Sequence, residues 1–400
     1  MLNFLNEYFL QQISTMVNVT NGTKFGGSCG EGIHLGPYLK SAIYSIILVA
    51  SLVGNIAIIC IVHRTRRLHN PTNYLIVNLA VSDLLGSVIN IPIAIAVQLR
   101  LFTTWSNDFV GRVSCALLPP LQGFFTYCSW FSITVIAVDR FCAVMFPLRH
   151  VMSPCVINIC LAATWLLSLF IISPLFYAMK VIKRFDKYVC LETWEPLFDT
   201  LEARKIYTIF LFFTSYVFPL VVIVPLYSCV IHRVWFRTVP GNVTDAIQRV
   251  QSKSKKRVLR MLVTVVVMFV LCCFPFQIHI FLQYNFNDSL SKCAVTPNVT
   301  FVMFSLVFAN YAINPFIYFA FSKEYCTALC TLLGSIHRAC KLRRTKRMSR
   351  GHELPAKEVI EIASFRKLNE AHSSTVCLEA DCHHKTKQEK MWRGRNINWI

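Results

Sequence analysis

The sequence predicts an all-α membrane protein, a seven-transmembrane helix bundle followed by a short amphipathic eighth helix. Of its 400 residues, 55% are hydrophobic and only 15% are charged, whereas a soluble domain has roughly 25% charged residues. Seven apolar runs are long enough to cross a bilayer, which takes ~20 residues of helix. The many aromatic residues exclude a largely disordered chain. Although the net charge is +20, so apolar a composition argues against a partner that is a nucleic acid.

The seven predicted spans are runs that contain one charge or none. They are Ala42–Val62, Tyr74–Val97, Val113–Val138, Cys155–Met179, Ile206–Ile231, Val258–Tyr284 and Val299–Phe321. Seven such runs in series argue against the buried helices of a soluble protein. Because the first residues lack a basic region and a small-residue cleavage site, we expect no cleaved signal peptide. The chain then divides into an extracellular N-terminal segment (1–40), the bundle (41–322), an amphipathic membrane-surface helix (323–336) and a cytoplasmic tail that we expect to be disordered (337–400).

The distribution of Lys and Arg predicts the orientation of the bundle. With the N-terminus outside, 29 of the 40 basic residues fall on cytosolic segments, whereas the acidic residues divide evenly between the two sides. The positive-inside rule therefore predicts an extracellular N-terminus in a multi-pass membrane protein. The basic tail would lie near acidic membrane lipids. Asn18 and Asn21 begin glycosylation sequons in the outer segment.

Four cysteines lie on the predicted outer side: Cys29, Cys115, Cys190 and Cys293. An oxidising exterior permits two disulfides among them. A Cys115–Cys190 bridge would hold the long loop after the fourth span over the end of the third. A Cys29–Cys293 bridge is a second hypothesis, with two free thiols as its alternative. On the cytosolic side, Cys326 and Cys330 follow the last span and are candidates for palmitoylation.

Polar and proline residues inside the spans form an ordered series. It comprises Gly54-Asn55, Leu79-Ala80-Val81-Ser82-Asp83, Asp139-Arg140-Phe141, Trp165, Pro219 with Tyr227, Phe269 with Pro275, and Asn314-Pro315-Phe316-Ile317-Tyr318. Polar groups within a bilayer are costly and therefore usually functional. In this order and spacing, from Ala42 to Cys330, the sequence resembles a rhodopsin-like G-protein-coupled receptor of the neuropeptide-receptor type. The resemblance implies a receptor rather than an enzyme, which activates a heterotrimeric G protein and binds arrestin after phosphorylation.

The resemblance also implies roles for individual residues. Coupling to the G protein is expected of Asp139, Arg140, Leu148, Tyr227 and Tyr318. The activation switch is expected to include Trp130, Pro219, Phe269, Cys273, Pro275, Asn314 and Pro315. No cofactor is expected other than an allosteric sodium ion, whose ligands would be Asp83, Ser129, Asn310 and Asn314. A protonated, purely structural Asp83 is the alternative to the sodium site.

The switch departs from the family pattern at two positions. Cys273 stands where the family usually has a tryptophan two residues before the proline of the sixth span, and Trp130 stands where it usually has a small aliphatic residue. Because empty volume in a core is costly, we hypothesise that Trp130 supplies part of the volume that Cys273 lacks.

Two exclusions narrow the expected ligand. Gln122, eighteen residues before Arg140, replaces the acid of amine receptors, and no lysine lies between Lys292 and Lys323 for a retinal Schiff base. Gln122 resembles the amide of neuropeptide receptors, which can donate to and accept from peptide groups, although it could instead bond neighbouring helices. The candidate ligand-binding residues are Gln122, Thr126, Gln98, Gln277, His279, Gln283, Phe304, Glu192 and Glu202. The alternative to a peptide is a lipid or another small non-amine ligand.

Overall fold

The computed structural model describes residues 35–101, 105–146, 153–184, 187–236, 245–285 and 297–334. Five of the predicted site residues lie outside these ranges: Asn18, Asn21, Cys29, Leu148 and Cys293. The side chain of Gln283 also lies outside the described part of the chain.

Seven helices of the described residues are long and apolar enough to cross a membrane, which confirms the predicted fold class. They are α2 (Pro37–Arg64), α3 (Pro71–Gln98), α4 (Phe109–Met145), α5 (Pro154–Ala178), the continuous α6 (Thr200–Phe212), η2 (Phe213–Val217) and α7 (Phe218–Phe236), α8 (Asp245–Asn285) and α10 (Pro297–Phe321). A short turn, η1 (Arg66–Leu68), joins α2 to α3. Residues 323–334 form the expected further helix.

Side-chain caps set several helix starts that apolar runs alone do not mark. Asp108 accepts a hydrogen bond from the Gly111 amide at 2.7 Å, so α4 begins before the predicted third span. Asp199 accepts from two amides at the start of α6, which begins six residues before the predicted fifth span. Hydrophobicity marks the part of a helix that fits the bilayer, whereas capping marks where the backbone becomes helical.

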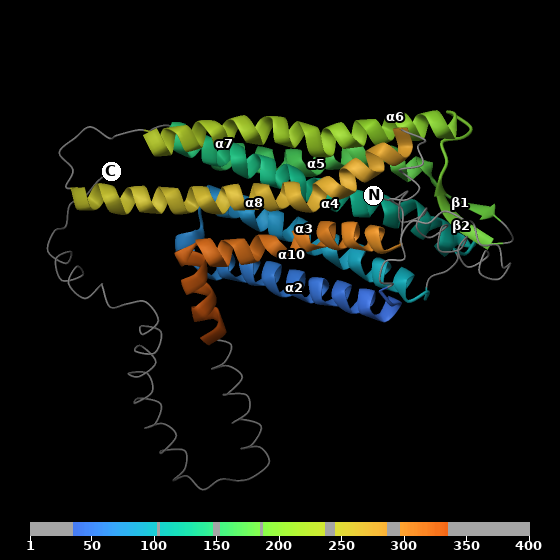
Figure 1. The fold of residues 1–400 in the computed structure, drawn as a ribbon, viewed down its shortest axis with the longest axis horizontal. Helices are drawn as coiled ribbons and strands as arrows, with labels where there is room; N and C mark the ends of the chain where they lie inside the picture. The colour runs from blue at the N-terminus through green and yellow to red at the C-terminus, as the bar shows by residue number, and fades with distance from the viewer. Residues whose placement is uncertain are drawn as a thin grey trace, which may run out of the picture. The chain divides into compact units, whose positions relative to one another are not determined.

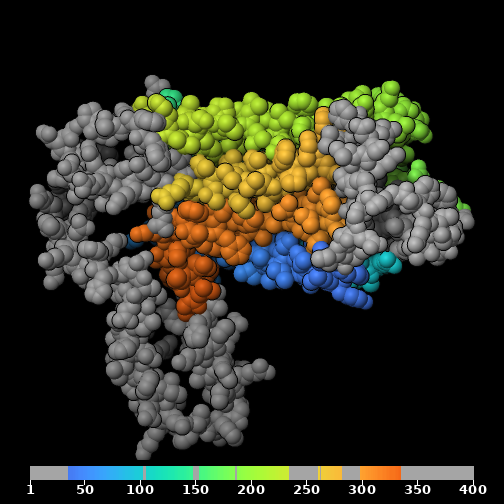
Figure 2. All heavy atoms as spheres, in the orientation of Figure 1, coloured from blue at the N-terminus to red at the C-terminus, as the bar shows by residue number. Residues whose placement is uncertain are grey.

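The helices of the first compact unit, Met1–Thr331, pack as a bundle with α3 between α2 and α4, and α10 against α2, α3 and α8 (Figure 1). Figure 2 shows α7, α8, α10 and α2 side by side on one face. Trp165 on α5 donates its indole N–H to Asn78 on α3 at 2.8 Å, and Asn78 donates to Ser132 on α4 at 2.8 Å. These bonds join three helices through their side chains. In the second unit, Leu332–Ile400, the described residues 332–334 are helical.

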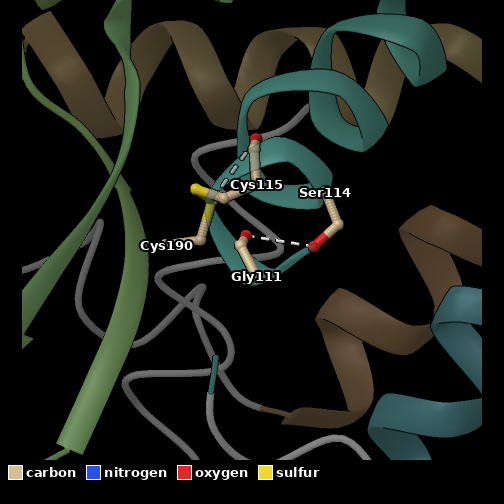
Figure 3. The surroundings of a disulfide bond; sticks show 4 residues. All are labelled: Gly111, Ser114, Cys115 and Cys190. Carbon is tan, nitrogen blue, oxygen red and sulfur yellow. Dashed lines mark hydrogen bonds between the residues drawn. A yellow bond between two sulfur atoms is a disulfide. The ribbon is translucent and has the colours of Figure 1, made fainter. Parts of the chain in front are cut away.

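An antiparallel hairpin, β1 (Met179–Arg184) with β2 (Lys187–Glu192), follows α5 at one end of the bundle, which we call the hairpin end. Cys190 on β2 forms the predicted disulfide with Cys115 on α4, with a Cα–Cα distance of 5.6 Å. Figure 3 shows this bond where β2 passes the first turns of α4. A β-carbon at Gly111 would overlap the carbonyl group of Ser106, so glycine is required where the preceding chain folds back against α4. The bridge therefore ties the hairpin to a closely packed helix start.

Candidate functional site

The end of α4 opposite the hairpin carries the ion pair expected from the sequence. The Arg140 guanidinium donates from Nε to Asp139 Oδ2 at 2.8 Å and also from Nη2 to the same oxygen. Thr72 on α3 donates to this oxygen at 2.8 Å. The Asp139 side chain is 4% exposed and that of Arg140 is 22% exposed. A nearly buried carboxylate therefore holds a guanidinium that still reaches solvent.

Tyr227 and Tyr318 lie near the Asp139–Arg140 pair. A third tyrosine, Tyr325, belongs to the helix 323–334 and packs on Tyr318. Tyr227 and Tyr318 are both buried. The Tyr318 ring lies 6.0 Å from that of Tyr325, and the Tyr325 hydroxyl donates to Asn73 Oδ1 at 3.0 Å. Burial raises the pKa of the Tyr325 phenol, so the hydroxyl stays protonated as a donor. Tyr325 thus links the helix 323–334 to α3, a contact that no sequence motif indicated.

The middle of the bundle holds Asp83, whose side chain is 0% exposed. Asn314 Nδ2 donates to Asp83 Oδ2 at 2.8 Å. Ser129 lies beside the carboxyl group and donates to Ser82 at 3.1 Å, and Asn310 is buried on α10. The structure therefore brings the four residues of the expected sodium site into the bundle interior, with Asp83 and Asn314 in direct contact.

Three of the predicted switch residues form a buried layer, which we call the switch layer: Trp130 on α4, with Phe269 and Cys273 on α8. The others are Pro219 on α7, Pro275 on α8, and Asn314 and Pro315 on α10. The Trp130 indole packs edge to face on Phe269, with ring centroids 5.8 Å apart. It also lies close to the Cys273 thiol, and both side chains are buried. This is the contact that the volume hypothesis for Trp130 and Cys273 requires. Pro219 and Pro315 are also buried, and Pro275 is half-buried.

A cavity of about 70 Å³ lies above this layer, toward the hairpin. Its lining residues are Gly123, Thr126, Tyr127, Trp130, Ile172, Leu175, Glu192, Tyr207, Thr208, Leu211, Phe212, Ser215, Phe276, Gln277 and Ile280. Three candidate ligand-binding residues, Thr126, Glu192 and Gln277, are therefore among them. Trp130 forms part of the lining as well, so the cavity and the switch layer share a side chain.

The other candidate residues lie elsewhere. Gln98, Gln122, His279 and Phe304 are buried but are not among the lining residues, and Glu202 is exposed in the first turn of α6. Gln122 is one helical turn from the cavity, because its carbonyl accepts a hydrogen bond from Thr126 Oγ1 at 2.8 Å. Sequence reasoning missed Tyr127 and Tyr207, since tyrosines in apolar helices carry no motif that marks the cavity they line.

Glu192 occupies the end of β2 at the cavity, where its side chain is 2% exposed. Trp194 Nε1 donates to its carboxyl group at 2.6 Å, and Arg204 Nη2 donates to its backbone carbonyl at 2.6 Å. The Trp194 ring packs on Tyr207 at 5.3 Å. The hairpin thus presents one acidic group to the cavity from a position held by neighbouring side chains.

Residues 54–318 match the family model described as 7 transmembrane receptor (rhodopsin family). The chain is 30% identical over 247 residues to the substance-P receptor of Aquarana catesbeiana, an alignment covering 61% of this chain and 59% of that protein. It is 28% identical over 318 residues to the RYamide receptor of Drosophila melanogaster, covering 77% and 66%, and 31% identical over 300 residues to neuropeptide FF receptor 2 of Mus musculus, covering 70% and 69%. The matched region thus spans about two thirds or less of the length of the first two relatives.

Proposed function

Because this chain belongs to the rhodopsin family of seven-transmembrane receptors, we propose that it binds an extracellular peptide at the hairpin end and activates a heterotrimeric G protein at the opposite end. The observation that carries the ligand assignment is the cavity beneath the disulfide-anchored hairpin, with Thr126, Glu192 and Gln277 as polar lining. Relatives that are named as receptors for substance P, RYamide and neuropeptide FF support a peptide over a lipid or another small non-amine ligand.

The size of the cavity limits how much of a peptide it can hold. Sites that enclose a drug-sized ligand are roughly 300–1,000 Å³, and this one is about 70 Å³. We therefore infer that one side chain or the end of a peptide enters the cavity, while the remainder lies against the hairpin.

A ligand screen tests this assignment. Cells expressing the chain are exposed to a panel of amidated neuropeptides and a panel of bioactive lipids, with calcium and cyclic AMP as readouts. We expect a response to at least one peptide, which Gln277→Ala weakens. A response to lipids together with silence to every peptide would overturn the peptide assignment.

Coupling would follow from release of Arg140. In the structure, Asp139 holds the guanidinium and itself accepts a hydrogen bond from Thr72 on α3. A peptide that binds more tightly to a conformation in which this pair is broken shifts the population toward it, and by reciprocity the G protein tightens peptide binding. Tyr227 and Tyr318 would contact Arg140 in that conformation.

The donor set around Asp83 fits a sodium ion. Asp83 Oδ1 and Asn55 Oδ1 are buried oxygens with no hydrogen-bond partner among the described residues. Hard cations take such carboxylate and carbonyl oxygens as ligands. With Ser129 and Asn314 beside it and Asn310 buried on α10, Asp83 would hold sodium, whose positive charge would compensate the buried carboxylate.

Removal of sodium is expected to destabilise the receptor. Replacing sodium chloride with choline chloride at constant ionic strength should lower the thermal unfolding midpoint of the purified protein, whereas Asp83→Asn should make the midpoint insensitive to the exchange. Glu195→Gln, which neutralises an exposed acid, should retain the sodium dependence. Equal sodium dependence in all three proteins would contradict the site.

Trp130 and Cys273 are expected to be energetically coupled. Cys273→Trp should overpack the layer and Trp130→Ile should leave a cavity, each costing about 1–3 kcal/mol of unfolding free energy. The double variant should recover part of this loss, because the added indole would occupy the vacated volume. Thermal unfolding of the four proteins measures the coupling, and additive losses would show that the two side chains do not compensate each other.

We further propose plasma-membrane location with an extracellular N-terminus, contact with membrane lipids, and arrestin binding after phosphorylation of the tail. The exposed thiols of Cys326 and Cys330 are accessible to palmitoylation. The basic composition of the predicted cytosolic segments supports the orientation.

A further inference from the structure

Tyr311, which belongs to no motif of the sequence, joins α10 to three other helices at the centre of the bundle. Its side chain is 1% exposed. Its hydroxyl lies 3.0 Å from Asn90 Nδ2 on α3 and 2.7 Å from Thr126 Oγ1 on α4. Its backbone carbonyl accepts from Asn55 Nδ2 on α2 at 2.9 Å. One residue of α10 is thus bonded to α2, α3 and α4.

The hydrogen bonds around the Tyr311 hydroxyl have a single consistent direction. Asn90 Nδ2 can only donate, so the tyrosine oxygen accepts from it. Thr126 already donates to the carbonyl of Gln122 at 2.8 Å, so the Tyr311 hydroxyl donates to Thr126. Both hydroxyl protons in this series of hydrogen bonds, those of Tyr311 and Thr126, therefore have an acceptor. Removing one of the bonded groups leaves a buried partner unpaired.

The position of the ring depends on a glycine of α3. A β-carbon at Gly86 would lie 3.2 Å from Cζ of Tyr311, closer than ordinary van der Waals contact. The ring therefore packs directly on the α3 backbone. Asp83 and Cys273 both lie near enough to interact electrostatically with the Tyr311 hydroxyl.

The same residue connects the ligand cavity to the middle of the bundle. Thr126 lines the cavity, and Tyr311 bonds to it. Asn314 follows Tyr311 by three residues on α10, nearly one helical turn, and donates to Asp83. Thr126 is therefore connected to the Asp83–Asn314 pair by the Tyr311 hydroxyl group and by nearly one turn of α10.

We propose that Tyr311 is a switch residue that transmits ligand occupancy from Thr126 to the Asp83–Asn314 pair, an inference that rests on the receptor function proposed above. When a ligand moves Thr126, the Tyr311 hydroxyl loses its acceptor inside the protein, where an unpaired donor is unfavourable. The tyrosine and α10 then adopt a second arrangement rather than a continuous deformation, since packed interiors favour discrete states.

Basal guanine-nucleotide exchange on a panel of purified G-protein heterotrimers, with no ligand added, tests this role. Tyr311→Phe keeps the ring and removes the hydroxyl, and Thr126→Val removes its acceptor. Since the bond belongs to a structure in which Asp139 holds Arg140, we expect each variant to raise basal exchange by about fivefold. The double variant should show no further rise. Ser168→Ala removes an equally buried hydroxyl that bonds within α5, and it should leave basal exchange unchanged.

Thermal unfolding of the same proteins distinguishes the ways in which the proposal can fail. If the losses of stability in Tyr311→Phe and Thr126→Val add up in the double variant, the two side chains are not coupled by a hydrogen bond, which would overturn the switch. Non-additive losses with unchanged basal exchange would make the bond purely structural and would also overturn it. If the wild-type chain promotes no exchange with any heterotrimer, even with a peptide that it binds, the receptor function itself is overturned and the switch with it.

Discussion

Arg140→Ala is expected to reduce ligand-stimulated nucleotide exchange by roughly 100-fold, the upper part of the range for coupling between two sites, while ligand affinity in the absence of G protein stays within about threefold of the wild type. The guanidinium is the group that we propose to be released toward the G protein, and alanine has nothing to release. The ligand cavity lies on the other side of the switch layer from Arg140 and has no lining residue in the Asp139–Arg140 pair. Radioligand binding and nucleotide exchange on the same membranes measure the two effects.

Two further variants separate this role from a general loss of positive charge. Arg112→Ala removes an exposed arginine near the hairpin end and should leave exchange unchanged. Asp139→Asn weakens the hold on Arg140 and should raise basal exchange. Wild-type exchange in Arg140→Ala, or an equal loss in Arg112→Ala, would contradict the proposed coupling mechanism.

Loss of the Cys115–Cys190 disulfide should produce the largest loss of stability of any single change. The bridge closes a sequence separation of 75 residues, for which the chain-entropy model gives about 4.5 kcal/mol. Because the neighbouring helices are already restrained in a membrane, this figure is an upper limit for the unfolding free energy. We also expect high-affinity peptide binding to be lost, since β2 carries Glu192 to the cavity.

Cys115→Ser, Cys190→Ser and the double variant should have the same thermal unfolding midpoint, because either substitution removes the whole bridge. Cys229→Ser, which replaces an exposed free thiol, serves as the matched control and should unfold as the wild type does. A double variant much less stable than either single variant would indicate separate roles for the two thiols.

Much of the candidate site could be predicted, because the motif residues are recognised by their type and by their position within an apolar span. A carboxylate within an apolar span, such as Asp83, can be recognised from the sequence alone. Burying a charged group in a membrane is costly, so such a residue is usually functional. The disulfide was also predictable, because few cysteines fall on the outer segments. Tyr311 was not, since an aromatic residue in an apolar helix is indistinguishable in sequence from one that only packs. Its role depends on Asn90 and Thr126, which lie on other helices.

The candidate ligand-binding residues also depend on contacts that the sequence does not reveal. Glu192 and Glu202 are acids of one predicted outer segment, yet one lines the cavity and the other is exposed. The difference arises because β2 pairs with β1 and is held by Cys115, whereas Glu202 lies in the first turn of a capped helix. Residue type and approximate depth were known from the sequence, but the direction of each side chain was not.

The sequence by itself determined the seven spans and the motif positions, because hydrogen bonding within each helix makes membrane insertion a property of a local run of about 20 residues. The tertiary structure alone decided which polar groups meet. The bonds that join Asp83 to Asn314, Thr126 to Tyr311 and Asn55 to Tyr311 span 231, 185 and 256 positions. Such contacts depend on the rotation and packing of whole helices against one another, which no local pattern of residues specifies.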